Sequence, residues 1–186
     1  GSIKINKEER VKMLKTIPRN SVIGFLIGVL PGAGATIASF LAYGMERNLV
    51  SDEEKEKFGK GSVHGLSAPE TANNAACSGA FVPLLTLGIP GSGTTAVMLG
   101  ALLGFGIQPG PRLYVTNPEI FWSVIMSMYI GMVILLILNL PLIPYIARIL
   151  AVPKNYLIPL ILFFSITGIY VMSFNNFDIY LMIGIA

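Results

Sequence analysis

Two long apolar stretches of this sequence are interrupted by the same short pattern of proline, glycine and threonine. The first interruption reads LPGAGAT (30–36) and the second reads IPGSGTT (89–95). Both follow the order apolar–Pro–Gly–small–Gly–small–Thr. Proline lacks an N–H donor and clashes with the preceding helical turn, and glycine has a low helix propensity. Each pattern therefore predicts a gap in an otherwise helical segment.

The composition places these gaps in a membrane protein. Of the 186 residues, 53% are hydrophobic and only 12% are charged, and the mean hydropathy is +0.70. A soluble domain usually carries about 25% charged residues. The chain ends within the apolar run YLMIGIA, so we expect it to be a piece of a longer protein. The opening Gly1-Ser2 fits a native start or a cloning scar equally well.

Apolar runs and charged connections divide the chain into segments of an all-α integral membrane protein. The expected order is a basic interfacial segment (1–20), a re-entrant helical hairpin broken at LPGAG (21–45), a charged cytoplasmic loop (46–67), a discontinuous membrane helix broken at IPGSG (68–107), a loop (108–118), a transmembrane helix (119–140), a connection (141–154), a second transmembrane helix (155–174) and the start of a further span (175–186). A solvated linker is the alternative for the first segment. Within the charged loop, Ser51 and Glu54 have the spacing of a capping box.

The distribution of basic residues favours a hairpin for the first broken stretch. If residues 21–45 enter and leave the membrane on one side and residues 68–107 cross it, only Arg112 of the 13 lysines and arginines faces the opposite side. Basic residues concentrate on the cytoplasmic side of membrane proteins. Topologies with two full crossings or two hairpins divide the charges less consistently.

Non-helical backbone at membrane depth is tolerated only where it is buried in protein or lines a wet cavity. Half-helix N-termini attract anions there, unwound carbonyls can bind cations, and paired interruptions point to a transporter's binding site. Packing of small residues between helices is the alternative explanation. The candidate substrate- or ion-binding residues are Pro31, Gly32, Ala33, Gly34, Thr36, Asn73, Asn74, Pro90, Gly91, Ser92, Gly93, Thr94 and Thr95.

The stretch SAPETANNAACSG (67–79) adds polar groups near the start of the second broken stretch. Glu70 is a candidate for binding a coupling proton or sodium ion, because ionisable groups in membranes are costly. Its alternative role is a structural charge at a helix N-terminus after Pro69. The amides of Asn73 and Asn74 can donate to a carboxylate and accept from a cation.

Other motifs argue against catalysis and nucleotide binding. GIPGSGTT (88–95) approaches a phosphate-binding loop, but Thr94 stands where that motif requires lysine. The sole histidine, His64, cannot form a His-based zinc site or a catalytic triad alone, and we expect it in a loop. The single Cys77 excludes an internal disulfide and is expected to pack as a small residue. We therefore expect no enzyme activity and no cofactor apart from sodium as a candidate coupling ion.

Three stretches resemble a known family. GFLIGVLPGAGATIASFLAYGMER, FGKGSVHGLSAPETANNAACSGAFVPLLTLGIPGSGTTAVMLGALLGFGIQPGPRL and NNFDIYLMIGI are similar to the large membrane subunit of the tripartite tricarboxylate transporter family (TctA). The similarity runs from about Ser21 to the end of the chain. It is weakest in the residues before Ser21.

This resemblance implies a fragment of the C-terminal half of a longer subunit, forming one repeat of a two-repeat transporter in the bacterial inner membrane. It also implies two partners, a small membrane subunit and an extracytoplasmic (periplasmic) solute-binding protein. The implied activity is import of citrate-like carboxylates driven by a sodium or proton gradient rather than by ATP. A passive anion channel without ion coupling is the alternative function.

Overall fold

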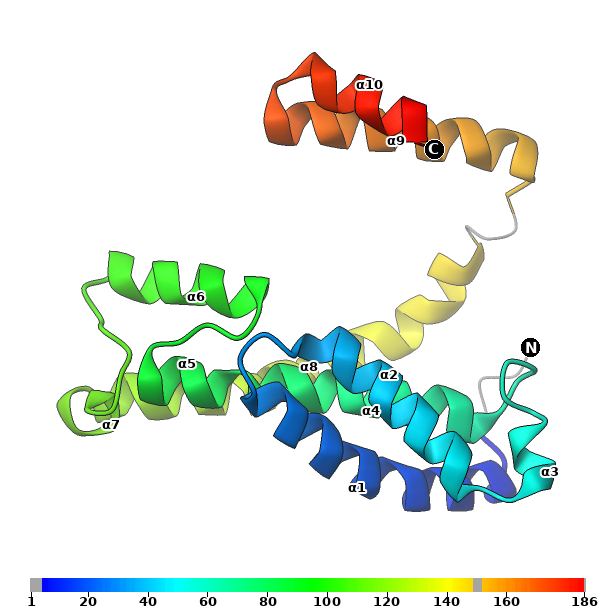
Figure 1. Cartoon of the computed structure of the whole chain (residues 1–186), viewed down its shortest axis with the longest axis horizontal. Helices are drawn as coiled ribbons and strands as arrows, with labels where there is room; N and C mark the ends of the chain where they lie inside the picture. Colours follow the sequence, from blue (N-terminus) through cyan, green and yellow to red (C-terminus); the bar gives the residue numbers. More distant parts are fainter. Residues whose placement is uncertain (1–4, 149–151, 186) are drawn as a thin grey trace. The chain divides into compact units, whose positions relative to one another are not determined.

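The computed structural model describes residues 5–148 and 152–185, and every regular element in them is helical. Figure 1 shows these helices in chain order. They are α1 (Lys7–Val29), α2 (Gly34–Leu49), α3 (Asp52–Lys55), α4 (Val63–Gly79), α5 (Phe81–Leu87), α6 (Gly93–Gly104), α7 (Leu113–Thr116), α8 (Pro118–Ala147), α9 (Lys154–Ser173) and α10 (Asn176–Ile185). The all-helical prediction is thus confirmed, whereas the re-entrant hairpin and the repeat remain predictions.

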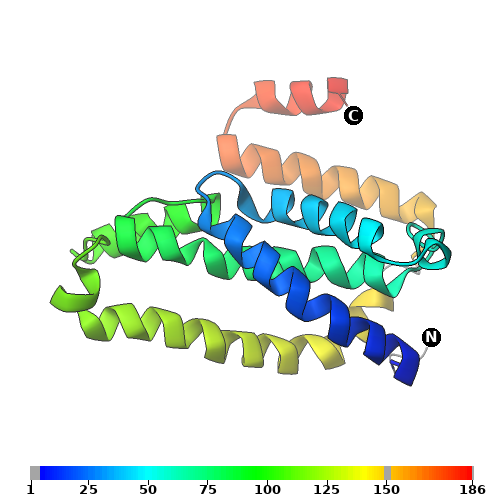
Figure 2. The same cartoon turned by 60° about the horizontal axis from the view of Figure 1, so that its bottom comes forward.

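The chain divides into two compact units, residues 1–128 and 129–186. In the first unit α1, α2 and α4 lie side by side, as both views show (Figures 1 and 2). α1 and α2 are connected by the first Pro–Gly pattern. α4 contacts both of them along its length.

Small residues at every fourth position allow α1 and α4 to pack backbone against backbone. Gly24 of α1 faces Ala72 of α4, and Gly28 faces Ala76, so closely that a Cβ atom at either glycine would overlap the opposing carbonyl. Ala38 and Ala42 of α2 complete the buried cluster with Ala72 and Ala76. Membrane helices commonly associate through such small-residue stripes, because close backbone approach maximises van der Waals contact.

A second cluster organises the region after the second Pro–Gly pattern. Leu85 of α5, Leu102 of α6 and Leu113 of α7 are buried together. The first turns of α8 pack against them through Phe121 and Val124. α6 therefore folds back along α5 instead of continuing it (Figure 1).

The second unit contains the rest of α8 together with α9 and α10. By length and composition, residues 118–147 and 154–172 can each cross a membrane, with mean hydropathies of 2.4 and 1.8. No residue of the most apolar window in either helix is buried. Their apolar side chains are exposed in this structure, as expected of surfaces that face lipid or other protein segments.

Several helices have bounds that differ from those of the expected segments. α4 begins at Val63, so Pro69 and Glu70 lie inside the helix and Glu70 is not an N-terminal charge. α8 continues through Pro141 and Pro144 to Ala147 instead of ending near residue 140. Both helices thus continue through a proline.

Two further expectations concern the N-terminal part of the chain. Residues 7–29 form one helix, with no boundary at residue 20. Ser51 does precede α3, but its side chain makes no capping hydrogen bond. Glu54 instead pairs with Lys12 and Lys57, at 3.0 and 2.7 Å, so the predicted capping box is absent.

The α1–α4 contact predicts different effects for two glycine substitutions. Gly28→Ala should destabilise the protein by about 1–3 kcal/mol, because its methyl group would overlap the Ala76 carbonyl. Gly44→Ala should be neutral or stabilise by up to about 1 kcal/mol, because this exposed helical position has no neighbour within 4 Å. Thermal unfolding of the complete subunit in detergent measures both changes. Equal effects would contradict the close packing.

Candidate functional site

The two Pro–Gly patterns meet in space. The first lies between α1 and α2, and the second lies between α5 and α6. The backbone N–H of Gly32 donates to the carbonyl oxygen of Gly91 at 3.4 Å. A Cβ atom built on Gly91 would lie 3.7 Å from Cα of Pro31. Two gaps that are 59 residues apart in the sequence, from Gly32 to Gly91, thus form one contact.

The glycines are needed for the backbone path through these gaps. Gly32 and Gly34 have φ angles of +88° and +68°, and Gly88 has +70°. Residues with a Cβ rarely adopt this left-handed region. Gly88 also lies against Pro109, whose carbonyl oxygen would be 2.7 Å from an added Cβ. The positive φ angle therefore favours glycine at all three positions, and at Gly88 the nearby Pro109 carbonyl also leaves no room for a side chain.

The helices that follow the two gaps differ in whether a side chain accepts hydrogen bonds from the N–H groups of their first turn. α6 starts with a capping box, in which Ser92 Oγ accepts from the N–H of Thr95 and Thr95 Oγ1 accepts from the N–H of Ser92. α2 follows Ala33 without any side-chain cap. The first N–H groups of a helix have no partner within it and carry the positive end of its dipole. The start of α2 can therefore donate to an anion.

The candidate hydroxyls of the gaps differ in accessibility. Thr36 in the first turn of α2 and Thr94 in the first turn of α6 are exposed. Thr95 is buried, at 1% exposure, and its hydroxyl is used by the cap. Ser92 is half-buried and also caps α6. Thr36 and Thr94 are therefore the hydroxyls best placed to reach a ligand.

The structure does not gather the acidic and amide candidates around the gaps. Asn73 lies against α2, where its Nδ2 donates to Ser39 Oγ at 3.4 Å. Asn74 is exposed, and its Nδ2 donates to the carbonyl oxygen of Glu70 one turn earlier. Glu70 is exposed as well. The hydrogen-bond partners of the two asparagines thus lie in α2 and α4 rather than in the gaps.

A buried polar cluster was missed by the sequence analysis. Glu46 of α2 is completely buried, and its carboxylate accepts from Arg19 and Asn20 of α1. It also accepts from Thr16 Oγ1 at 3.1 Å. Nδ1 of His64 lies 3.0 Å from Glu46 Oε1. The expectation that His64 is a loop residue was therefore wrong, because it lies in the first turn of α4 and faces α1 and α2.

The four-residue spacing was the available signal for this cluster. In α1 the buried residues are Thr16, Asn20, Gly24 and Gly28, in α2 they are Ala38, Ala42 and Glu46, and in α4 they include His64, Ala68, Ala72 and Ala76. Each polar member thus continues a stripe of small residues. Positions that continue a buried stripe are themselves expected to be buried.

The environment of Glu46 favours its charged form. Burial raises the pKa of the Glu46 carboxyl, but the hydrogen bonds from Arg19 and Asn20 and the charge of Arg19 outweigh burial, and the pKa lies below its usual value. The Arg19 guanidinium binds both carboxylate oxygens, with Nη2 at 2.6 Å from Oε1 and Nε at 3.1 Å from Oε2. Such a two-pronged contact is the strongest geometry for this pair.

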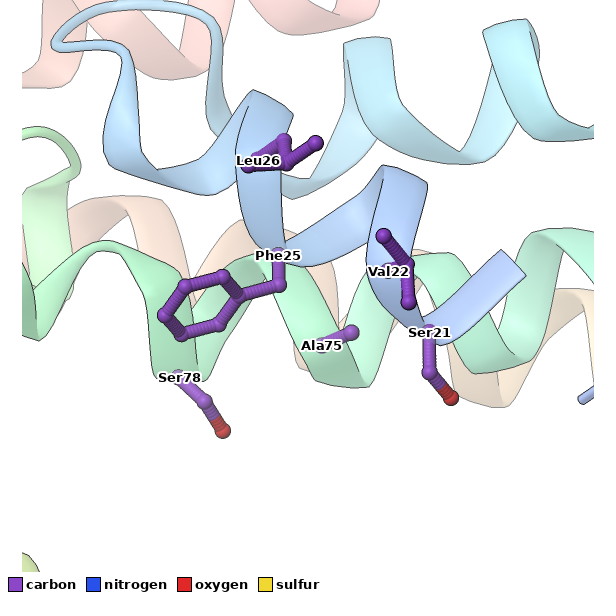
Figure 3. A pocket seen from close by; sticks show the side chains of 6 residues that line it. All are labelled: Ser21, Val22, Phe25, Leu26, Ala75 and Ser78. Atoms are coloured by element: carbon purple, nitrogen blue, oxygen red, sulfur yellow. The ribbon is translucent and has the colours of Figure 1, made fainter. Parts of the chain in front are cut away.

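A shallow apolar groove lies elsewhere on the first unit, between α1 and α4. Figure 3 shows its lining side chains, which are Ser21, Val22, Phe25, Leu26, Ala75 and Ser78. Four of its six lining residues are apolar, so the groove suits an apolar group better than a carboxylate. Among the described residues, no cluster of three or more His, Cys, Asp or Glu side chains could hold a metal ion.

Comparison with known proteins adds independent information. The family model described as "Tripartite tricarboxylate transporter TctA family" matches residues 1–186. The chain is 42% identical over 179 residues to the "Uncharacterized 52.8 kDa protein in TAR-I ttuC' 3'region" of Agrobacterium vitis, a match that covers 96% of this chain and 35% of that protein. It is 45% identical over 160 residues to the "Uncharacterized protein in TAR-II ttuC' 3'region" of the same organism, covering 86% of this chain and 65% of that protein.

The chain thus spans less than two thirds of the length of either relative. No solved structure matches it.

The contact between the gaps predicts a disulfide. Pro31→Cys combined with Gly91→Cys, in the complete subunit with Cys77→Ser and any other cysteines replaced by serine, should cross-link under mild oxidation, because a disulfide needs Cα atoms within about 7 Å. A mobility shift reversed by reductant reports the bond. Pro31→Cys with Gly100→Cys is the control, since Gly100 has no neighbour within 4 Å. Equal cross-linking of both pairs would contradict the contact.

The Glu46 cluster predicts a component of acid sensitivity. Because the folded-state pKa of Glu46 is lowered from 4.5, its charged form stabilises the fold fully above that value. This stabilisation is lost as the pH falls through the lowered pKa. Glu46→Gln should therefore reduce the thermal midpoint at pH 7 and lessen its decline in acid, whereas Glu53→Gln at an exposed position should do neither. Parallel midpoint–pH curves for wild type and Glu46→Gln would contradict this role.

Proposed function

Because the chain belongs to the tripartite tricarboxylate transporter TctA family, we propose that it is part of the permease subunit of an importer for tricarboxylates or related carboxylates. In this proposal, uptake depends on an extracytoplasmic solute-binding protein and a small membrane subunit, and a sodium or proton gradient drives it. The proposed location is the bacterial inner membrane, which the chain crosses more than once. The matched family consists of transport proteins, and the proposal includes no catalytic step.

The contact between the two gaps is the observation that carries this proposal. Gly32 and Gly91 connect two helix interruptions, and a helix N-terminus leaves each of them. Helix N-termini bind anions through free N–H groups and the helix dipole. Only the start of α2 lacks a side-chain cap, so it is the better placed of the two to hold a carboxylate group.

Polar groups beside the gaps support the same ligand class. The uncapped start of α2 offers N–H donors, and the exposed hydroxyls of Thr36 and Thr94 can donate to carboxylate oxygens. Unwound carbonyl groups in the same gaps suit a sodium ion. An anion and its coupling cation can thus be bound by neighbouring backbone segments without a permanently charged side chain.

The two exposed hydroxyls predict a transport defect. Thr36→Ala with Thr94→Ala should lower kcat/KM for carboxylate uptake on the order of tenfold per lost hydroxyl, because a hydrogen bond to a charged group contributes about 1.5–3 kcal/mol. Uptake of labelled citrate and a panel of other carboxylates is measured in proteoliposomes that contain the complete subunit and its partners. Thr116→Ala, at an exposed position in α7, is the matched control.

Each outcome distinguishes between functions. Saturable uptake that collapses with the ion gradient and shows counterflow supports the permease. Non-saturating flux without ion coupling would support the alternative, a passive anion channel. Wild-type kinetics in the double variant, with normal membrane insertion, would remove the two threonines from the site.

A further inference from the structure

The charged cluster around Glu46 lies along the same three helices as the gaps but apart from them. On α1, ten residues separate Asn20 of the cluster from Leu30 at the first gap, which is about 15 Å of helix. α2 runs back from the first gap and reaches the cluster at Glu46. The cluster therefore cannot contact a ligand bound at the gaps, and it has chemistry of its own.

We propose that this cluster is a proton-binding site, in which His64 takes a proton from water at Nε2 and Glu46 is its buried counter-ion. The proposal rests on the proposed transport function and identifies the coupling ion as a proton. No bond other than N–H forms, and the proton comes from solvent.

The hydrogen-bond geometry assigns the neutral tautomer. Nδ1 of His64 lies 2.7 Å from Thr16 Oγ1 and 3.0 Å from Glu46 Oε1. A carboxylate can only accept, so Nδ1 must carry the hydrogen if it is to contact Glu46 favourably. Thr16 Oγ1 can accept from the same N–H, while its own hydrogen is shared between the Lys12 carbonyl at 3.0 Å and Glu46 Oε1 at 3.1 Å. Nε2 is then an unprotonated acceptor and the place where a proton binds.

Access and counter-charge both favour proton binding at Nε2. The His64 side chain is 11% exposed, so it is largely enclosed but not sealed from water. Imidazole is the side chain that ordinarily changes charge between about pH 5 and 8. Glu46 on α2 is the carboxylate that contacts the imidazole, and Arg19 on α1 binds the same carboxylate. Lys12 on α1 is paired with Glu54 on α3.

Proton binding would change the partners of Glu46. Its Oε1 is already shared by Arg19, Thr16 and His64. An added positive charge on His64 competes with Arg19 for this oxygen. The Arg19 side chain is 38% exposed and can turn towards water, whereas His64 cannot. Protonation therefore weakens the Arg19–Glu46 link between α1 and α2.

This link connects the cluster to the binding gap. α1 ends and α2 begins at the first gap, so a change in their packing reaches Pro31 and Gly32 through rigid helices.

Histidine titration tests proton binding directly. The complete subunit, labelled with ¹³C-histidine, is compared with its His64→Asn variant, so that the missing resonance identifies His64. Asparagine can place an N–H donor near the Nδ1 position but has no site corresponding to Nε2. We expect the His64 ring resonances to change from the neutral to the protonated form as the pH is lowered, and Glu46→Gln to alter this change because it removes the facing carboxylate. If His64→Asn fails to fold, His64→Gln identifies the same resonance. A His64 resonance that stays unchanged as the pH is lowered would overturn the proposal.

Transport measurements separate this inference from the proposed function. His64→Asn should lose carboxylate accumulation driven by a pH gradient about tenfold or more, while counterflow without a gradient persists; tenfold corresponds to about 1.4 kcal/mol of coupling free energy. Lys60→Gln, at an exposed position three residues before α4, is the control. If wild type shows no saturable uptake, the transport function fails. If the wild type transports but His64→Asn still accumulates substrate on a pH gradient, only the proton-site proposal is wrong. The same conclusion follows if a sodium gradient alone drives uptake by the wild type and by His64→Asn.

Discussion

The close approach of the α1 and α4 backbones is the constraint on which the first unit depends. Gly24 and Gly28 leave no room for a side chain opposite Ala72 and Ala76. In lipid there is no hydrophobic driving force between helices, and contact area comes from close packing of small residues. The stripe repeats every fourth residue, so it determines which face of each helix is turned towards the other helices. It therefore also determines which residues meet at the two ends of the stripe.

The same stripe joins two regions with different chemistry. At one end it brings Thr16, Asn20, Glu46 and His64 together, with a buried carboxylate neutralised by Arg19. Towards the other end α1 and α4 lead to the interrupted segments, where Gly32 meets Gly91. In the proposed function, this three-helix unit connects the titratable groups at one end with the open backbone at the other.

Membership of the TctA family gives this arrangement a context. The chain spans only part of the length of the relatives it matches, and those relatives contain further segments. The backbone gaps suit a family that carries multiply charged carboxylates, because N–H groups and hydroxyls bind an anion without a buried cation. The charged cluster is built differently, from a carboxylate, a guanidinium and an imidazole.

The sequence by itself determined the all-helical membrane class, the family and the two helix interruptions at the Pro–Gly patterns. These properties follow from composition and from proline and glycine, which act locally on the backbone. It did not determine where helices continue, and α8 passes through Pro141 because its apolar neighbours outweigh one lost hydrogen bond.

Only the tertiary structure decided which distant groups meet. The contact of Gly32 with Gly91 and the burial of His64 against Glu46 depend on the packing of separate helices. No local pattern encodes such pairings. The surroundings of each residue depend on which faces of the neighbouring helices lie against it. Those contacts form only when the small-residue stripes pack together.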